Sequence, residues 1–486
     1  MRLKRNLSFL DLTSIVVGSI VGADIYIASA LSAGMIGPFS IFAWVVAGIF
    51  ATVIALVFAY CSYYVPKVGG PFAYVSKEFD DFYGFLTGWS LWIAEILALS
   101  VFAITFVNYL QYFIPLDISM QILVKFIFMF VLTSINVIGV KAAGKFNDIL
   151  TVIKMLPLIM IMVAGLAFFA LNPAAFAGNY TPIAPMGFGS FGTAVVLIFW
   201  AFVGFELGTL PASEVRNPKK TIPKAIITGM MIVMAFYLVT NFVVYGTVGW
   251  EQLSQTQTPL ILAGTTLLGV AGAIIIGIGA LVSVSGSDEA GVLGTARLSY
   301  AMSIDGLFPR VFSKVHPKYD TPYMALITQG VIGFILSTFS GIASMISFSV
   351  FNLSFSFLLT CVSLLIIKRG SEKSLHGQSI LPWAGIAICL YLLYSTTLFD
   401  KVVGSALILV VIPMYVFFSP KADIHHMKRL FISEESIFMR RVEHKEKFLA
   451  HFILILHRVY KRLRSETSDE AVENQSKKTI VHRRVR

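Results

Sequence analysis

The sequence GSIVGAD at residues 18–24 and the sequence WAFVGFE at residues 200–206 each interrupt an apolar segment that is long enough to span a bilayer. Each interruption combines glycine with an acidic residue, and we expect the two helices to be discontinuous near Gly18 to Asp24 and Gly204 to Gly208 and to face each other at mid-depth. Hydrocarbon offers no hydrogen-bond partner to a broken helix, so a break is tolerated only where it lines a polar cavity. Two such breaks, one at the start of each half of the chain, indicate the central binding site of an inverted-repeat secondary transporter.

The composition is that of a polytopic membrane protein. The 486 residues are 57% hydrophobic and only 13% charged, and the mean hydropathy is +0.81, which is too apolar for a soluble protein of this size. Apolar runs of about 20 residues predict twelve membrane-spanning helices. The predicted spans are 10–33, 38–65, 84–114, 121–140, 146–171, 188–211, 222–250, 268–303, 322–343, 345–369, 378–396 and 402–420.

Basic residues predict the orientation, because they gather before the first span and in every second loop. By the positive-inside rule both termini are cytoplasmic, as an even number of spans requires, and the chain is a multi-pass protein of the cell membrane. The basic residues concerned are Arg2, Lys4, Arg5, Lys67, Lys77, Lys141, Lys145, Arg216, Lys219, Lys220, Lys224, Arg310, Lys314, Lys318, Lys368, Arg369 and Lys373.

The sequence divides into a transporter core at residues 1–420 and a basic tail at residues 421–486. The tail holds 16 Lys and Arg against 9 Asp and Glu, a difference of +7 out of the whole-chain +11. We expect a solvated cytoplasmic extension that is attracted to anionic lipid headgroups, with a candidate amphipathic helix around residues 448–456. No recognition motif accompanies the charge, so we expect no nucleic-acid partner.

Several local patterns occur in an order that resembles the amino acid–polyamine–organocation superfamily, and the resemblance covers residues 8 to about 420. It implies an all-α membrane fold of twelve helices: a five-plus-five inverted repeat (LeuT-like) with discontinuous helices 1 and 6, and two additional helices. The patterns are GP at 37–38, GGPFAY at 69–74, GFLTGW at 84–89, EVRNPKKTIP at 214–223 and LGTARLSYAMSIDGLFPRVFSKVHPKYDTPY at 293–323.

The resemblance also implies a binding site for a small zwitterion. In the family the first break presents backbone N–H groups to the substrate carboxylate, and the break in the sixth span presents carbonyls to the substrate amine. The physics agrees, because half-helices begin with orphan N–H groups and end with orphan carbonyls. The first role falls on Ser19, Ile20, Gly22, Ala23 and Asp24, and the second on Trp200, Ala201 and Val203.

Three side chains add to this implied site. The sixth span resembles that of arginine–agmatine and putrescine exchangers, in which an aromatic residue matching Trp200 closes over the substrate and an acid matching Glu206 serves the gate or the cationic group. A Trp face over a cation is favourable by about 0.5–2 kcal/mol. Lys154 matches the lysine that stands at the sodium position of related sodium-coupled transporters. It is either a proton-coupling residue or a structural cation that caps carbonyls of the broken first helix. We expect its ammonium near the carbonyls of Val17 or Gly18 and near residues 283–287 of the eighth span.

Acidic residues are where the chain departs from the family. Asp24 stands where amino-acid permeases usually have glycine, and Glu95, Asp288 and Glu289 lie in other apolar spans. An ionised Asp24 about 4 Å from a substrate carboxylate would cost on the order of 4 kcal/mol at an effective dielectric constant of 20. The acids therefore favour a substrate that carries an additional positive charge.

These observations predict a secondary active transporter, either a proton-coupled symporter or an exchanger, that moves an amino acid, cationic amino acids included, by alternating access. The alternatives are a polyamine or diamine transporter and a non-transporting amino-acid sensor. A channel would need a continuous polar pore, and an enzyme would need a convergent catalytic set, which the motifs do not contain. We expect no enzymatic activity, cofactor or metal site. Substrate identity, coupling ion and oligomeric state stay open.

Overall fold

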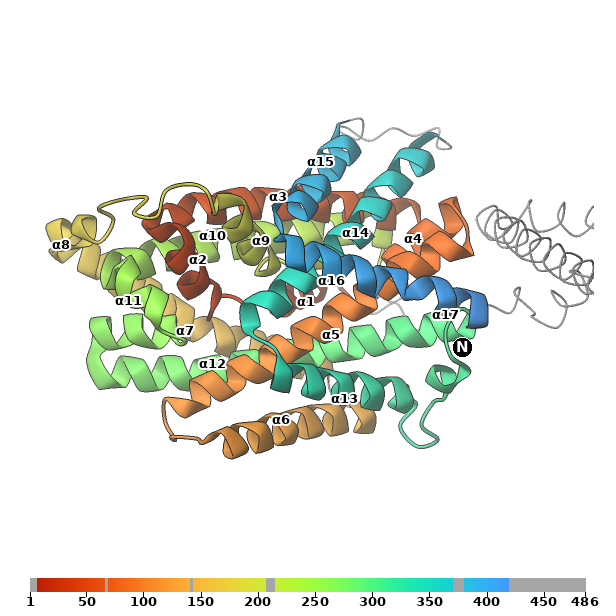
Figure 1. The fold of residues 1–486 in the computed structure, drawn as a ribbon, viewed down its shortest axis with the longest axis horizontal. Coiled ribbons are helices and arrows are strands. Elements are labelled where there is room, and N and C mark those ends of the chain that lie inside the picture. Colours follow the sequence, from red (N-terminus) through yellow and green to blue (C-terminus); the bar gives the residue numbers. More distant parts are fainter. Residues whose placement is uncertain (1–6, 66–68, 140–142, 207–214, 370–379, 419–486) are drawn as a thin grey trace, which may run out of the picture.

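The computed structural model describes residues 7–65, 69–139, 143–206, 215–369 and 380–418 (Figure 1). Within these ranges the chain consists of helices and turns, with one isolated β-bridge between Leu7 and Val215. The predicted all-helical fold is confirmed for this part of the chain. The basic tail at residues 421–486 and its candidate amphipathic helix lie outside the described residues.

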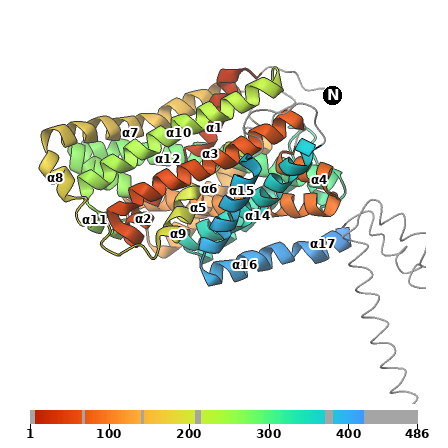
Figure 2. The same ribbon diagram turned by 90° about the horizontal axis from the view of Figure 1, so that it is seen from above.

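Figures 1 and 2 show most of the long helices running along the longest axis of the molecule, as in a membrane-embedded bundle. The elements are α1 (Phe9–Ile20), α2 (Ala28–Ile36), η1 (Gly37–Phe39), α3 (Ser40–Tyr64), α4 (Pro71–Glu78), α5 (Asp81–Gln111), α6 (Ile118–Ile138), α7 (Ala143–Leu171), α8 (Pro173–Gly178), α9 (Phe191–Trp200), α10 (Pro218–Val248), α11 (Trp250–Gln255), α12 (Pro259–Ile304), η3 (Arg310–Ser313), α13 (Tyr323–Phe339), α14 (Ile342–Arg369), α15 (Leu381–Ser395), α16 (Leu398–Leu409) and α17 (Val411–Phe418).

Short polar side chains determine where several helices begin. The Asp80 carboxylate accepts the N–H of Tyr83 at the start of α5, and the Asp117 carboxylate accepts the N–H of Met120 at the start of α6. Such N-cap bonds satisfy backbone donors that have no partner inside the helix. The α12 helix is bent at Gly269, whose φ is +62°, a conformation that glycine adopts without steric cost.

Eight helices are long and apolar enough to cross a membrane, and four shorter apolar helices accompany them in the described part of the chain. In the most apolar window of α5 and of α14, 67% of residues are buried, whereas in α6 the share is 17%. The α5 and α14 helices pack against each other and form the interior of the bundle. The α6 helix therefore lies at the rim, where its apolar side chains can face lipid.

The first predicted interruption is present. The α1 helix ends at Ile20, residues 21–27 form bends and turns, and the helix resumes as α2 at Ala28. The break begins slightly later than Gly18, because the N–H of Val21 still donates to the carbonyl of Val17.

The second interruption begins earlier than predicted. The α9 helix ends at Trp200, four residues before Gly204, and residues 201–206 continue as tight turns. The N–H groups of Ala201, Phe202 and Val203 each donate to the carbonyl three residues before them, so the last turn tightens before the chain leaves the helix. Residues 207–214, which include the predicted Gly208, lie outside the described residues.

Candidate substrate-binding site

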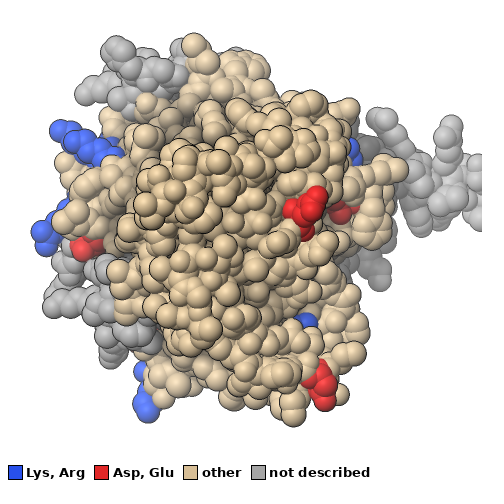
Figure 3. All heavy atoms as spheres, turned by 90° about the vertical axis from the view of Figure 1, so that its left-hand side faces the viewer, with Lys and Arg blue, Asp and Glu red and all other residues tan. Residues whose placement is uncertain are grey.

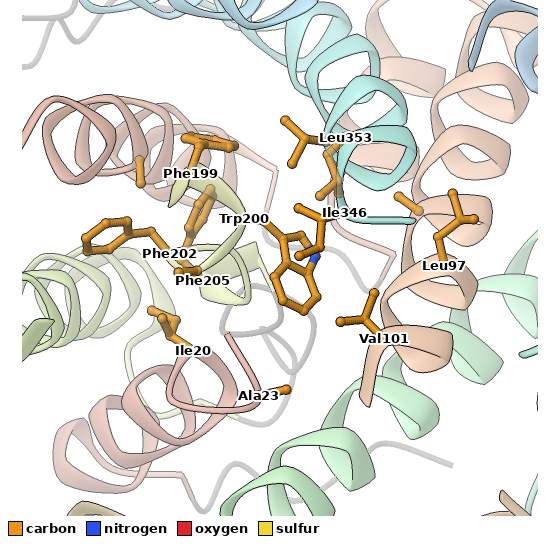
Figure 4. Close-up of a cluster of buried hydrophobic side chains, with 14 of the residues drawn as sticks. Ile20, Ala23, Leu97, Val101, Phe199, Trp200, Phe202, Phe205, Ile346 and Leu353 are labelled. Atoms are coloured by element: carbon orange, nitrogen blue, oxygen red, sulfur yellow. The ribbon is translucent and has the colours of Figure 1, made fainter. Parts of the chain in front are cut away.

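The two interruptions touch each other. The hydroxyl of Ser19 donates to the carbonyl of Gly204 at 2.9 Å. Gly204 has a φ of +121°, and a Cβ at this position would stand 2.7 Å from the carbonyl oxygen of Ser19. Only glycine allows the backbones to approach this closely. In Figure 4 Ile20 and Ala23 of the first segment lie near Phe202, Phe205 and Trp200 of the second, and all belong to one buried apolar cluster.

A pocket adjoins this contact, and its walls come from the end of α1 and the first break, from α5, from the end of α9 and the second break, and from α12 and α13. Its walls combine apolar and aromatic side chains with three acids, which is the usual make-up of a site for a small organic ligand. The lining residues are Ser19, Asp24, Glu95, Ile96, Ala98, Leu99, Phe102, Trp200, Val203, Gly204, Glu206, Gly291, Val292, Thr295 and Gln329.

Asp24 is held by a neighbouring helix. It is buried, with 4% of its surface exposed. The hydroxyl of Tyr237 on α10 lies 3.4 Å from Oδ2 of Asp24 and 3.1 Å from the carbonyl oxygen of Ile20. Tyr237 therefore ties both the end of α1 and Asp24 of the first break to α10.

Glu206 and Glu95 form the other acidic wall of the pocket. The N–H of Gly204 donates to Oε2 of Glu206 at 3.1 Å, and Glu206 is 1% exposed. Glu95 on α5 lines the same pocket, close enough to Glu206 for the two carboxyl groups to repel each other when both are charged.

Lys154 on α7 lies behind the first break. Its side chain is 1% exposed and its ammonium donates to the carbonyl of Gly18, in the last turn of α1. It is also close enough to Asp24 to attract that carboxylate. The predicted contact with the carbonyls around Gly18 is confirmed. The predicted proximity to residues 283–287 stays a prediction.

The structure brings part of the predicted site together. Ser19, Asp24, Trp200, Val203 and Glu206 line the pocket. Ile20, Gly22, Ala23 and Ala201 are buried behind that lining. The carbonyl of Trp200, predicted to bind the substrate amine, accepts the N–H of Val203 at 3.0 Å. The assignment of these residues as substrate ligands stays a prediction.

Two polar residues of the pocket were absent from the predicted site. Glu95 could have been proposed from the sequence, because an acid deep in an apolar span is costly in free energy unless it faces a cavity. Its position in the sequence does not show that it lies beside Glu206. Gln329 on α13 could not have been proposed, since one glutamine in an apolar helix does not reveal which face of the helix is buried. The side chains of Asp288 and Glu289 on α12 lie outside the described residues.

Comparison with known proteins gives consistent matches over the helical part of the chain. The family described as "Amino acid permease" matches residues 7–418. The branched-chain amino acid permease BcaP of Bacillus subtilis is 27% identical over 416 residues, covering 80% of this chain and 88% of the relative. The methylthioribose transporter of the same organism is 26% identical (81% and 88% covered), and its serine/threonine exchanger SteT is 25% identical (82% and 92% covered).

Proposed function

The chain belongs to the amino acid permease family, whose members are membrane transporters and not enzymes, and on that premise we propose that it is a secondary active transporter for an amino acid, cationic amino acids included, or a related organic amine. Transport proceeds by alternating access, as proton-coupled symport or as exchange. The observation that carries the proposal is the pocket beside two helix interruptions in contact, because irregular backbone inside a membrane protein is tolerated where it serves a cavity.

The proposed architecture is a five-plus-five inverted repeat of LeuT-like type with two additional helices, twelve spans in all. Eight long and four short apolar helices support it, and so do the breaks after α1 and α9. We further propose that both termini are cytoplasmic. Figure 3 views the end of the molecule that carries α8 and α11, and the few Lys and Arg side chains lie mainly at its rim, as expected for a non-cytoplasmic face.

The charge of the pocket supports a cationic substrate. Asp24, Glu95 and Glu206 line it, whereas the one lysine beside it, Lys154, is engaged by the carbonyl of Gly18. The face of Trp200 offers an additional favourable surface to an ammonium or guanidinium group. The relatives are named for branched-chain amino acids, methylthioribose, and serine and threonine, none of which is a net cation, so the support for a cationic substrate comes from the pocket.

Coupling is proposed to run through Lys154, which contacts α1 directly beside the break. If its ammonium releases and regains a proton during the cycle, the attachment of α7 to α1 changes with each turnover. Uptake by Lys154→Ala should then lose its dependence on an imposed pH gradient while exchange persists. An unchanged dependence would reduce Lys154 to a structural cation.

Uptake into proteoliposomes tests the proposed function. The purified full chain is reconstituted, and accumulation and counterflow are measured with labelled lysine, arginine, leucine, serine and putrescine. Gly189→Ala, at a loop position where a Cβ meets nothing within 4 Å, is the control for protein handling. Accumulation of at least one amine-bearing solute is expected. Binding by thermal stabilisation without accumulation or counterflow would instead identify a sensor.

A further inference from the structure

The pocket has a polar wall to which neither break contributes. It is lined by Glu95 of α5, by Gly291 and Thr295 of α12 and by Gln329 of α13, and these three helices pack against one another. We call these four residues the three-helix wall. A ligand group that reaches this wall meets side chains that are separate from the backbone groups of the two breaks.

Gln329 determines the hydrogen-bonding character of the three-helix wall. Its Nε2 donates to the carbonyl of Val292 at 2.6 Å. Because a carbonyl oxygen can only accept, this bond fixes which end of the amide group is the nitrogen. The other end, Oε1, is buried and has no hydrogen-bond partner among the residues that the structure describes. Gln329 therefore has an unused acceptor, and no unused acceptor-to-donor ambiguity, in the wall of the pocket.

The other polar side chains of the three-helix wall are acceptors as well. Glu95 contributes a carboxyl group, whose Oε2 would lie 3.9 Å from a Cβ added at Gly291. The hydroxyl of Thr295 donates its proton to the carbonyl of Gly291 at 2.8 Å, which leaves only its lone pairs for a ligand. Three acceptor side chains on one wall are complementary to a group that carries several N–H bonds.

The burial of Gln329 makes its unpaired oxygen informative. The residue is 1% exposed, and buried polar atoms in proteins are in general paired, because an unpaired one lowers stability. In a pocket wall the missing donor can come from a ligand. Such an acceptor discriminates strongly against a ligand without the donor, since that ligand buries the oxygen unpaired.

We propose that the three-helix wall is the side-chain subsite of the transporter and that Gln329 determines its specificity. The substrates it takes are amino acids whose side chain ends in a guanidinium, ammonium or carboxamide group. Gln329 Oε1 accepts one N–H of that group. Glu95 accepts another and adds attraction when the group is a cation. This inference rests on the proposed function and names the residues that select among its substrates.

Pairs of amino acids with side chains of similar length test the subsite in the unsubstituted chain. Lysine is compared with norleucine, and glutamine with methionine, as competitors of labelled arginine uptake into proteoliposomes that contain the purified full chain. The donor-bearing member of each pair should compete at least tenfold better. Equal competition within both pairs, or uptake of leucine without uptake of arginine, would overturn the inference and leave a transporter. Absence of uptake and counterflow for every amino acid and amine would contradict the proposed function, and the inference with it.

Two substitutions separate the roles of Gln329 and Glu95. Gln329→Met keeps the length of the side chain but removes the acceptor, so glutamine should lose at least tenfold relative to methionine. Glu95→Gln keeps an acceptor and removes the charge, so arginine should lose its advantage over citrulline, its uncharged analogue, while glutamine keeps its advantage over methionine. An unaltered ranking of glutamine and methionine in Gln329→Met would overturn the assignment.

Gly291→Ala tests the same wall without removing a hydrogen bond, and so covers the case in which Gln329→Met folds poorly. The added Cβ meets only Glu95 Oε2, at the ordinary contact distance of 3.9 Å, and the fold should tolerate it. Because the methyl group narrows the space beside Glu95, arginine and glutamine should lose competition relative to serine, whose side chain is too short to reach the wall. Equal losses for all three would place the side-chain subsite elsewhere and overturn the inference.

Asn136→Leu is the control for the loss of a buried amide. Asn136 on α6 is 5% exposed, and its Nδ2 donates to the carbonyl of Leu132 at 3.0 Å, as Gln329 does to that of Val292, but it does not line the pocket. The variant should change the melting temperature without changing the ranking of glutamine and methionine. If it changes that ranking as strongly as Gln329→Met does, the effect of Gln329→Met is not local and the inference fails.

Discussion

The two helix interruptions are fixed by different means. The first, at residues 21–27, is fixed by side chains from neighbouring helices: Lys154 of α7 binds the carbonyl of Gly18, and Tyr237 of α10 reaches both Ile20 and Asp24. The second, after Trp200, is fixed by its own backbone through the positive φ of Gly204. Substitutions at the first break should thus alter charge and selectivity, whereas substitutions at the second should alter backbone geometry and the contact between the breaks.

The largest expected effect is at the first break. Lys154→Ala removes a buried cation from the Gly18 carbonyl and from the neighbourhood of Asp24. Removing one member of a buried ionic arrangement typically costs about 3–5 kcal/mol, so thermal unfolding should shift strongly. Lys125→Ala is the matched control, because Lys125 also donates to a carbonyl, that of Ser337 at 2.7 Å, but is only partly buried on α6.

We expect about 0.5–1.5 kcal/mol for the control, the net value of an ordinary hydrogen bond. Differential scanning of both variants in detergent gives the comparison. Similar shifts in melting temperature for the two lysine variants would mean that Lys154 contributes no more than an ordinary hydrogen bond. The first break would then not depend on side chains of neighbouring helices in the way argued above.

At the second break a smaller but still large effect is expected from Gly204→Ala. A non-glycine residue at this φ costs about 1–3 kcal/mol, and the added Cβ would lie 2.7 Å from the Ser19 carbonyl oxygen, so the two breaks must separate. Transport should fall at least tenfold for amines and amino acids alike. Gly189→Ala, which introduces no contact within 4 Å, should transport like the unsubstituted chain.

A change of substrate ranking in Gly204→Ala, with the total rate preserved, would contradict this division of roles. It would show that the second break contributes to selectivity through its own groups rather than through its distance from Ser19. Uptake competition between lysine and cadaverine measures both quantities in one assay.

The sequence predicted the helical fold and the existence of both breaks, because hydropathy and glycine placement are local properties. It also predicted that Lys154 meets the carbonyls near Gly18, through the family resemblance. It did not predict that α9 ends at Trp200, since the tight turns there depend on the approach of Gly204 to Ser19 across the bundle. Contacts between distant segments leave no periodic signal in one sequence.

The acids show the same limit more sharply. Glu95 was recognised as unusual, but its contact with Glu206 depends on how α5 is rotated against the second break. The role of Asp24 was predicted as a direct partner for a substrate cation. The structure adds that the hydroxyl of Tyr237 lies 3.4 Å from this carboxyl group, a contact that depends on the packing of α10 against the first break.

The smallest effect is expected for Tyr237→Phe, which tests whether the stability of the first break and the selectivity for substrate depend on different groups. Tyr237→Phe removes the hydroxyl that lies 3.4 Å from Asp24 and 3.1 Å from the Ile20 carbonyl, while its ring can keep its packing on Trp44 and Phe202. The expected loss of stability is about 0.5–1.5 kcal/mol. Because Asp24 and the other acids of the pocket stay in place, the ranking of amines against amino acids should change only slightly.

Tyr245→Phe is the matched control on the same face of α10. Its hydroxyl lies 2.8 Å from Ser32 Oγ and 3.1 Å from the carbonyl oxygen of Ser29 on α2, away from Asp24. The two variants should lose similar stability, since each removes one buried hydroxyl with two partners, and only Tyr237→Phe should move the ranking of amines against amino acids at all. If Tyr245→Phe moves it equally, the orientation of α2 as a whole sets selectivity, and Asp24 acts through the helix that follows it rather than through its own carboxylate.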